Sequence, residues 1–379
     1  MEYSIYLTTN CNFECAYCYE NSDICNLQTM SREMLIKTID DIFIRNTDGL
    51  YYIKFFGGEP LLALDNITFA VDYIKRTYSN KGIVCFLINT NGSLLTDEVI
   101  DFFKVNNFHV KISLDGDHYN NNLNRKSKNG SDMYYDILNQ AIKLKERNIK
   151  NSIRMTVTAN TLSSLFSNVA YLYECGFKDF CIGLDFTHCY TDQELSLYEH
   201  ELEKLADFYL EILKRNETIS IDVFSGQFSK FIFDFESKFI MCGGGIYSFR
   251  YMPDGNVYPC NLVCGDSKFC IGNVSSGISI KRIMPVITSC MKKDTECLKC
   301  DIAFYCHYMK CGYANYLNTG FFNLPSTQNC AIQKTTYKIV ESVFDYIATF
   351  KPQMLSKYIS YAAKNNIKLR KEVEFLNSL

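Results

Sequence analysis

The stretch Thr9-Asn10-Cys11-Asn12-Phe13-Glu14-Cys15-Ala16-Tyr17-Cys18-Tyr19 carries three cysteines with the spacing C-x3-C-x2-C. It directly follows an apolar, β-branched run over residues 3–8 that predicts a strand. In parallel α/β sheets and barrels, active sites are built on the loops at the carboxyl ends of the strands. Three thiolates in such a loop can bind three irons of a cubane cluster and leave the fourth iron open. The alternatives are a zinc site or three unrelated buried thiols, although structural zinc usually takes four ligands and the neighbouring sequence has no histidine.

Similar apolar runs recur along the first half of the chain, with helix-forming stretches between them. The predicted strands are Tyr3–Thr8, Tyr51–Phe56, Ile83–Ile88, His109–Leu114, Ile153–Thr158 and Phe180–Phe186. The predicted helices between them are Ser31–Ile44, Leu64–Tyr78, Thr96–Val105, Tyr134–Lys145 and Leu162–Tyr173. Thr96 and Ser31 are expected to cap their helices through the side-chain hydroxyl. Strands that alternate with helices predict an α/β fold with a parallel sheet, either open or closed into a barrel.

The composition is that of a folded chain rather than a disordered or fibrous one. Of 379 residues, 47% are hydrophobic, which suffices for two domains or for one large domain with an appendage. Lys and Arg number 39 against 42 Asp and Glu, so the net charge of −3 argues against binding nucleic acid by phosphate neutralisation. No apolar run approaches the roughly 18 residues of a membrane span, and residues 1–4 show no secretion signal. We therefore expect a cytoplasmic protein without a membrane or nucleic-acid partner.

Eighteen cysteines are the unusual feature of the composition. The cytosol keeps thiols reduced, so metal or redox chemistry explains them better than disulfides do. After a predicted helix over Gln193–Lys214, a second cysteine-rich region runs from about residue 242 to residue 330, with short runs, glycine pairs and turns. Helix is predicted again over Ala331–Thr349 and Pro352–Leu376. The predicted domains are residues 1–220, residues 221–349 and a helical tail over residues 350–379.

The first cysteine loop resembles the signature of the radical S-adenosylmethionine (SAM) superfamily, including the aromatic Tyr17 before the third cysteine. Four further stretches match that family in register along the chain, each following a predicted strand or lying downstream of the last. They are Gly57-Gly58-Glu59-Pro60, Asn89-Thr90-Asn91-Gly92, Ser113-Leu114-Asp115-Gly116 and Leu123-Asn124-Arg125-Lys126. Each alone is weak evidence, because Asn-Gly and Asp-Gly are ordinary turn dipeptides. Together they cover residues 1–190 and imply the family's (βα)6 partial barrel.

The resemblance also implies the roles of these residues. Cys11, Cys15 and Cys18 would hold a 4Fe–4S cluster, and the Gly57–Pro60 turn would expose backbone groups to the amino end of the methionyl moiety. The remaining SAM-binding residues implied are Tyr17, Asn91, Ser113, Asp115 and Arg125. In the family, one electron cleaves SAM, and the resulting 5′-deoxyadenosyl radical removes a hydrogen atom from the substrate. The protein positions the substrate, receives the electron from a flavodoxin- or ferredoxin-type donor and excludes water.

The second cysteine set is similar to the SPASM domain, which carries two auxiliary 4Fe–4S clusters in radical SAM enzymes that modify peptides and proteins. Its spacing departs from the family's at one place, because four residues rather than three separate Cys306 from Cys311. The resemblance implies one auxiliary cluster on Cys297, Cys300, Cys306 and Cys330. It implies the other on Cys242, Cys260 and Cys311, where Cys260 follows Gly255 in a G-x4-C motif. A zinc ribbon with scattered cysteines is the alternative.

The set on Cys242, Cys260 and Cys311 is one ligand short. Either Cys264 or Cys270 completes it, or one iron is open and can bind a substrate thiolate; the open iron is favoured. The other cysteines are expected to be buried apolar residues, namely Cys25, Cys85, Cys175, Cys181, Cys189 and Cys290. The histidines His118, His188 and His307 are expected at the surface or in hydrogen bonds, without a ligand role.

SPASM proteins mostly modify ribosomally made peptides or proteins, so we expect a peptide maturase. Two reactions compete, a thioether crosslink from a cysteine sulfur to a carbon, and oxidation of a sulfatase Cys or Ser to formylglycine. Sulfatase maturases resemble each other in an Asp directly after the cysteine of the G-x4-C motif, whereas this chain has Asn261, which cannot accept a proton at neutral pH. We therefore place thioether formation first and formylglycine formation second, and we assign no catalytic acid or base.

Two further expectations concern partners and the third class of function. Many thioether maturases carry a leader-binding domain before the barrel. A thioether maturase with this layout would recognise its peptide in another way or use a separate leader-binding protein. The chain would otherwise be a multi-cluster electron carrier without SAM chemistry. The Gly57–Pro60 turn argues against that class, because an electron carrier has no use for a SAM-binding turn.

Overall fold

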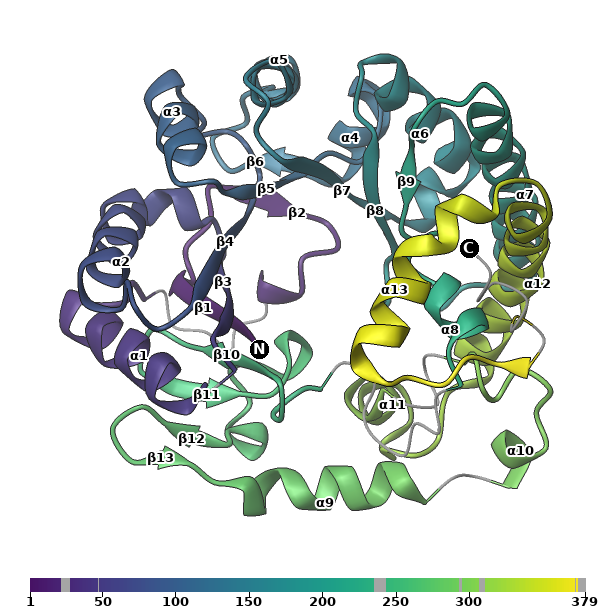
Figure 1. The fold of residues 1–379 in the computed structure, drawn as a ribbon. Coiled ribbons are helices and arrows are strands. Elements are labelled where there is room, and N and C mark those ends of the chain that lie inside the picture. Colours follow the sequence, from purple (N-terminus) through teal and green to yellow (C-terminus); the bar gives the residue numbers. More distant parts are fainter. Residues whose placement is uncertain are drawn as a thin grey trace. The chain divides into compact units, whose positions relative to one another are not determined.

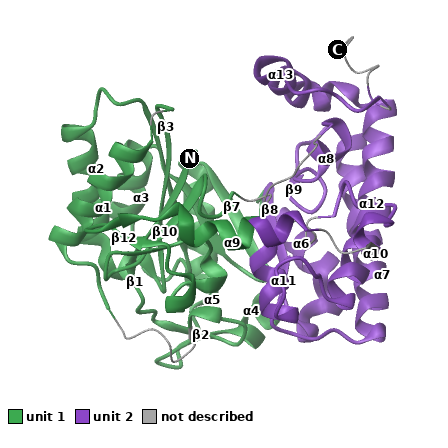
Figure 2. Cartoon of the chain, turned by 90° about the horizontal axis from the view of Figure 1, so that it is seen from below, with its two compact units in different colours: residues 1–155, 174–177, 242–287 green, residues 156–173, 178–241, 288–379 purple. Residues whose placement is uncertain are grey.

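The computed structural model describes residues 1–21, 28–46, 48–234, 243–292, 295–306, 311–371 and 373. It divides into two compact units, coloured green and purple in Figure 2. Unit 1 comprises Met1–Met155, Glu174–Phe177 and Cys242–Ile287, and unit 2 comprises Thr156–Tyr173, Lys178–Met241 and Thr288–Leu379. Both units join segments that are distant in the sequence. They therefore do not test the predicted domain boundaries, which stay predictions.

Unit 1 is built on parallel strands that neighbour one another in chain order. These strands are β1 (Glu2–Thr8), β3 (Leu50–Gly57), β4 (Ile83–Thr90), β5 (His109–Ser113) and β7 (Asn151–Val157), whose last residues belong to unit 2. Their register aligns Ile5 with Phe55, and Phe55 with Ile88. On its other side β1 pairs in parallel with a strand from the far end of the unit. That strand and its antiparallel neighbours are β10 (Ser248–Tyr251), β11 (Asn256–Tyr258), β12 (Gly272–Asn273) and β13 (Gly277–Ile278).

Helices connect these strands and cover one face of the sheet, as α1 and α2 do in Figure 1. The helices of unit 1 are α1 (Arg32–Arg45), α2 (Leu64–Thr77), α3 (Asp97–Val105), α4 (His118–Asn124) and α5 (Tyr134–Glu146), with short turns η1 (Tyr19–Asn21), η2 (Pro60–Ala63), η4 (Asn261–Val263) and η5 (Ser267–Phe269). A separate pair of short strands, β2 (Phe13–Cys15) and β6 (Arg125–Ser127), is antiparallel. In β1, residues 3–8 are all buried, which is typical of a central parallel strand.

Unit 2 is mainly helical. Its elements are η3 (Ala159–Ser164), α6 (Leu165–Glu174), β8 (Asp179–Leu184), α7 (Asp192–Lys214), β9 (Ser220–Ile221), α8 (Phe228–Ile232), α10 (Thr295–Leu298), α11 (Gly312–Thr319), α12 (Thr327–Phe350), η7 (Pro352–Leu355) and α13 (Ser356–Asn365). The helix α9 (Ile280–Met291) begins in unit 1 and ends in unit 2. The long helices α7 and α12 pack together, and Tyr198 and Thr336 share a buried hydrogen bond of 3.2 Å between them.

The predicted strands and most predicted helices of the first half are confirmed. Ser31 and Thr96 cap α1 and α3 by accepting hydrogen bonds from the Met34 and Val99 amides, at 3.2 and 3.3 Å. The α/β class with a parallel sheet is therefore confirmed. The predicted helix over Pro352–Leu376 is wrong in extent, because α13 ends at Asn365 and Asn366 takes the left-handed conformation that terminates a helix.

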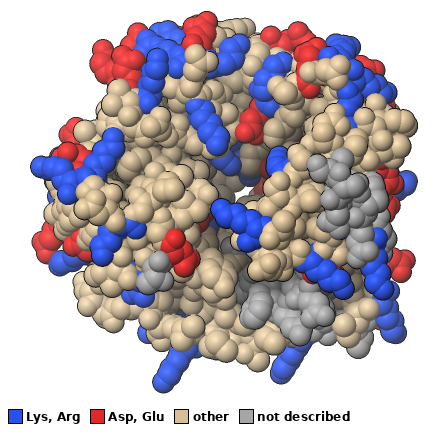
Figure 3. Space-filling view, viewed as in Figure 1, with Lys and Arg blue, Asp and Glu red and all other residues tan. Residues whose placement is uncertain are grey.

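The surface carries charges of both signs. On the face in Figure 3, Lys and Arg side chains are interspersed with Asp and Glu side chains between wider uncharged areas. No helix in the described part of the chain is long and apolar enough to cross a bilayer.

Candidate functional site

The predicted cluster loop lies where β1 ends. Cys15 is the last residue of β2 and stands opposite Arg125 of β6, and the Cys18 amide donates a 3.0 Å hydrogen bond to the Cys15 carbonyl. Burial raises the pKa of the Cys11 thiol to about 11, with a further rise from the neighbouring Glu59, Cys15 and Cys18. The three thiols are thus close enough to interact electrostatically. A metal binds the deprotonated thiolate, so these thiols would release their protons on binding one.

A cavity of about 380 Å³ opens beside this loop in unit 1. Its lining residues come from the loop, from the end of α4 and from β6, namely Glu14, Cys15, Ala16, Cys18, Leu123, Asn124 and Lys126. A volume of this size lies within the range of small-molecule and cofactor sites. Two of the three predicted cluster ligands therefore border a space of cofactor size.

The turn Gly57-Gly58 lies directly against the start of the cysteine loop. The Gly58 amide donates to the Thr8 carbonyl at 2.9 Å, and the Glu59 amide donates to the Asn10 carbonyl at 2.7 Å. A Cβ atom on Gly57 would stand 2.1 Å from the Thr8 oxygen, and one on Gly58 would stand 2.2 Å from the Asn10 oxygen. Such distances are far inside van der Waals contact, so both positions require glycine.

The Glu59 carboxylate is buried and joins this turn to the end of β4. It accepts hydrogen bonds from the Leu61 amide at 3.0 Å, from the Thr90 hydroxyl at 2.7 Å and from the Asn91 amide at 2.7 Å. Burial raises the pKa of Glu59, and these hydrogen bonds oppose the rise. The Glu59 side chain thus holds the start of η2 and the end of β4 in place. Pro60, the last residue of the predicted SAM-binding turn, is buried at the start of η2.

Asn91 connects β4 to the cysteine loop. Its side-chain amide donates to the Asn12 oxygen at 2.8 Å and lies 3.9 Å from the Cys11 sulfur. Ser93 donates from both its amide and its hydroxyl to the Asn91 oxygen. The structure therefore places Asn91, a predicted SAM-binding residue, against the cysteine loop. Ser113, which was also predicted to bind SAM, is the half-buried last residue of β5.

Three of the predicted residues meet in one buried hydrogen-bonded group. The Tyr17 hydroxyl donates to the Asp115 carboxylate at 2.7 Å and accepts from the Arg125 guanidinium at 2.5 Å. Burial alone would lower the pKa of Arg125, but Tyr17, Cys15 and Asp115 outweigh burial and raise it. Arg125 is therefore a buried cation that fixes Tyr17, in the middle of the cysteine loop, to the end of β5.

In the second cysteine set, Cys260, Cys264 and Cys270 lie in unit 1. The Cys264 sulfur donates to the Cys260 carbonyl at 3.4 Å, and the Cys270 sulfur donates to the Gly272 carbonyl at 3.2 Å. Burial raises the pKa of Cys264 well above its usual range. Cys242 lies outside the described residues, and Cys311, which precedes α11, is in unit 2. The ligand set of this auxiliary cluster therefore stays a prediction, including its open iron.

Asn261, next to Cys260, is held by an arginine that sequence reasoning missed. Its side-chain oxygen accepts a hydrogen bond from Arg250, and its amide donates to the Tyr19 hydroxyl at 3.5 Å. Arg250 also donates to the Ser248 hydroxyl at 2.6 Å and lies 3.4 Å from a Glu2 oxygen. The side-chain oxygen of Asn261 is therefore already bonded to the Arg250 guanidinium, and its side-chain nitrogen acts as a hydrogen-bond donor.

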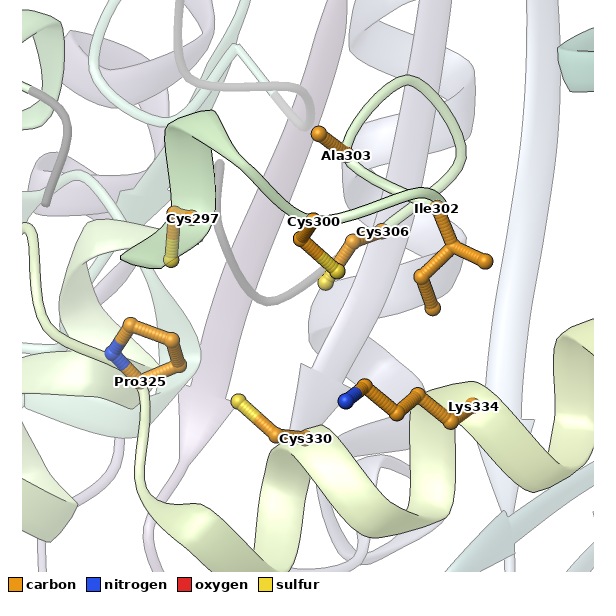
Figure 4. A pocket seen from close by; sticks show the side chains of 8 residues that line it. All are labelled: Cys297, Cys300, Ile302, Ala303, Cys306, Pro325, Cys330 and Lys334. Atoms are coloured by element: carbon orange, nitrogen blue, oxygen red, sulfur yellow. The ribbon is translucent and has the colours of Figure 1, made fainter. Parts of the chain in front are cut away.

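The four predicted ligands of the other auxiliary cluster come together in unit 2, as Figure 4 shows. They come from α10, the following turns and the first turn of α12, and they line one pocket: Cys297, Cys300, Cys306 and Cys330, with Ile302, Ala303, Pro325 and Lys334. Among the described residues, no three His, Cys, Asp or Glu side chains converge closely enough for a single metal ion. A cubane cluster binds each thiolate at a different iron, so its ligands surround a volume rather than a point.

The cysteines without a predicted role are less buried than expected. Cys189 is exposed in the loop before α7, which makes its predicted burial wrong. Four others are only half-buried, namely Cys85, Cys175, Cys181 and Cys290, and Cys25 lies outside the described residues. Two histidines take acidic partners as expected, His118 with Asp132 and His188 with Glu194, while His307 is outside the described residues.

A parallel α/β enzyme with a three-cysteine loop at the carboxyl end of its first strand is the class that this fold and site define. Residues 5–163 match the model of the radical SAM superfamily, so this part of the chain is a radical SAM domain. Members of that superfamily use a 4Fe–4S cluster and SAM. The cysteine spacing in the second half of the chain resembles that of a SPASM domain.

Similarity to known proteins extends over most of the chain. It is 27% identical over 315 residues to a cysteine-type anaerobic sulfatase-maturating enzyme of Clostridium perfringens (strain 13 / Type A), covering 77% of this chain and 84% of that one. It is 24% identical over 278 residues to the antilisterial bacteriocin subtilosin biosynthesis protein AlbA of Bacillus subtilis (strain 168), covering 71% and 56%. The solved structure of native anSMEcpe with bound AdoMet and Cp18Cys peptide has the same fold, with a TM-score of 0.77, 23% identity and coverage of 92% and 98%.

Proposed function

We propose that this enzyme is a radical SAM maturase of peptides or proteins that oxidises a sulfatase cysteine to formylglycine. The observation that carries the proposal is the similarity to a cysteine-type sulfatase-maturating enzyme, which extends over 77% of the chain. This similarity supports formylglycine formation better than thioether formation, which was placed first from Asn261 and the missing ligand. The order of the two reactions is therefore reversed here.

The residues of unit 1 fit the cofactors of this chemistry. Cys11, Cys15 and Cys18 would hold a 4Fe–4S cluster, and the backbone of the Gly57–Pro60 turn would meet SAM. When bound, these groups supply a one-electron cleavage that removes a hydrogen atom from an unactivated carbon. Arg125 and Tyr17 fix the loop, so that the site is organised before the substrate arrives.

The overall reaction balances without a net oxidant other than SAM. A cysteine side chain, SAM and water give the aldehyde, hydrogen sulfide, 5′-deoxyadenosine, methionine and a proton. The electron that starts the reaction is returned when the substrate radical is oxidised. An external donor, of the flavodoxin or ferredoxin type, is then needed only to prime the enzyme and to replace lost electrons.

The side chain at position 261, an asparagine, favours the second candidate function, thioether crosslinking. Its oxygen accepts a hydrogen bond from Arg250, so this side chain cannot take a proton from the substrate. Another group must accept that proton in formylglycine formation. In a thioether maturase, the substrate thiol would instead lose its proton on binding iron.

The test is anaerobic incubation of the reconstituted, reduced enzyme with SAM and a peptide containing the Cys of a sulfatase active site. Formylglycine formation predicts an aldehyde that a hydrazine reagent traps, together with 5′-deoxyadenosine. The same peptide with Ala in place of Cys is the control. A thioether product, which is two hydrogen atoms lighter and gives no hydrazone, would replace the proposal by its second candidate.

A further inference from the structure

Among the described residues that line the cysteine pocket of unit 2, one is charged, namely Lys334 (Figure 4). Lys334 follows Cys330 by four residues on α12, so the two side chains lie on the same helix face one turn apart. Figure 4 shows the lysine side chain extending back along the helix towards Cys330, with its amino group directed into the pocket. A cation therefore faces the space that four thiols enclose.

Within the described residues, Lys334 has no ion pair with an acidic side chain. Lys338, one turn further along α12, is different, because its amino group lies 3.4 Å from a Glu199 oxygen and its side chain is 73% exposed. Burial raises the pKa of the Cys330 thiol, Cys306 adds to the rise, and Lys334 opposes it. The positive charge of Lys334 therefore acts on the cysteines of the pocket, and no described acidic side chain neutralises it.

Charge determines what such a cation does to an iron–sulfur site. Four thiolates already make the site negative, and one-electron reduction, by dithionite in a titration, adds a further negative charge. A nearby cation stabilises the more negative state more than the less negative one, and so raises the reduction potential. Because Lys334 is itself exposed, water and salt screen part of this effect.

We infer that Lys334 raises the reduction potential of the auxiliary cluster held by Cys297, Cys300, Cys306 and Cys330. The inference rests on the proposed function in one respect, namely that these cysteines hold a cluster. Lys334 acts through the cluster and does not touch the substrate. It makes this cluster the better electron acceptor for the step in which the substrate radical is oxidised.

The experiment is a potentiometric titration of the reconstituted full-length enzyme, followed by electron paramagnetic resonance at low ionic strength. Signals that SAM does not change belong to the auxiliary clusters. Lys334→Gln removes the charge, Lys334→Arg keeps it, and Lys338→Gln is the matched control on the same helix. Lys334→Gln is expected to lower one auxiliary midpoint by about a tenfold change in the reduction equilibrium, which is 59 mV for one electron.

Support requires that Lys334→Arg restores most of the wild-type midpoint and that Lys338→Gln leaves it unchanged. The inference is overturned if Lys334→Gln titrates like the wild type, if Lys338→Gln shifts the midpoint as much, or if iron analysis finds no auxiliary cluster. Failure of the proposed function gives a different result. In that case the midpoint shifts as expected while the sulfatase peptide yields no aldehyde.

Discussion

The two cysteine sites differ in what surrounds their ligands. The loop with Cys11, Cys15 and Cys18 is fixed by polar contacts, including the hydrogen bonds of Tyr17 to Asp115 and Arg125. The described residues that line the pocket of unit 2 are four cysteines, three apolar residues and Lys334. We therefore expect the protein alone to organise the first site, and the second site to depend more on the metal cluster for its order. The difference suggests that the first must accept an exchangeable cofactor, and the second only a permanent one.

Removing Arg125 should have the largest effect on the first site. Arg125→Met leaves Asp115 and Tyr17 buried without their cation, and breaking a buried ionic group costs about 3–5 kcal/mol. We expect the iron-free protein to melt at a clearly lower temperature, as measured by circular dichroism. Lys128→Met, at an exposed position just beyond β6, is the control and should leave the melting temperature unchanged. Equal melting temperatures for the two variants would contradict a protein-organised loop.

Gly58→Ala should disturb the same loop by steric contact. The new Cβ would stand 2.2 Å from the Asn10 carbonyl oxygen, so the turn and the loop must separate. A displacement near 1 Å at a reacting site costs roughly 100-fold in rate, and we expect SAM cleavage to fall by about that factor. Gly277→Ala is the control, because its Cβ would meet no atom within 4 Å. It adds only the backbone strain of a φ of +86° and no steric contact with the loop. If both variants cleave SAM equally well, the close packing has no role in catalysis.

Removing the metal should show directly how far the protein alone organises each of the two cysteine sites. Metal binding contributes folding free energy to a site that the protein does not organise alone. Hydrogen exchange of iron-free and reconstituted protein should therefore show about a tenfold gain in protection on reconstitution over residues 295–306, or about 1.4 kcal/mol. The gain should be smaller for β2 and β6. A larger gain at β2 and β6 would reverse the comparison.

Thr90→Val should have the smallest effect. It removes one of the three donors to the buried Glu59 carboxylate, and a lost hydrogen bond of this kind costs about 1 kcal/mol. We expect a weaker apparent affinity for SAM, by about fivefold, measured by equilibrium binding to the reconstituted enzyme. Thr90→Ser keeps the hydroxyl and should bind SAM as the wild type does. A weakening with serine as large as with valine would exclude the hydrogen bond as the cause.

Local sequence signals predicted the parts of the fold that depend on neighbours in the chain. The capping hydroxyls of Ser31 and Thr96 mark helix starts that the structure confirms, because a cap is made within the first turn. The end of α13 was missed, since Asn366 gives only a weak stop signal without glycine or proline. Short strands such as β2 and β6 were missed as well, because three residues carry no readable periodicity.

Contacts between distant segments could not be derived from the residues alone. Arg125 and Tyr17 are 108 positions apart, and nothing in the sequence around either residue indicates that they form a hydrogen bond. Arg250, which holds Asn261, and Lys334, which faces the thiols, were also missed. The spacing of Lys334 from Cys330 was the one available signal, since residues four apart on a helix share a face.

The return of the chain to unit 1 has a consequence for its synthesis on the ribosome. Glu2 of β1 pairs with Tyr52 on one side and with Ser248 of β10 on the other. At roughly 5–20 residues per second, the second neighbour emerges roughly 10–40 seconds after the first. Throughout that time β1 is an open sheet edge, which favours pairing with other chains. A nascent-chain chaperone that covers this edge should therefore raise the yield of folded enzyme.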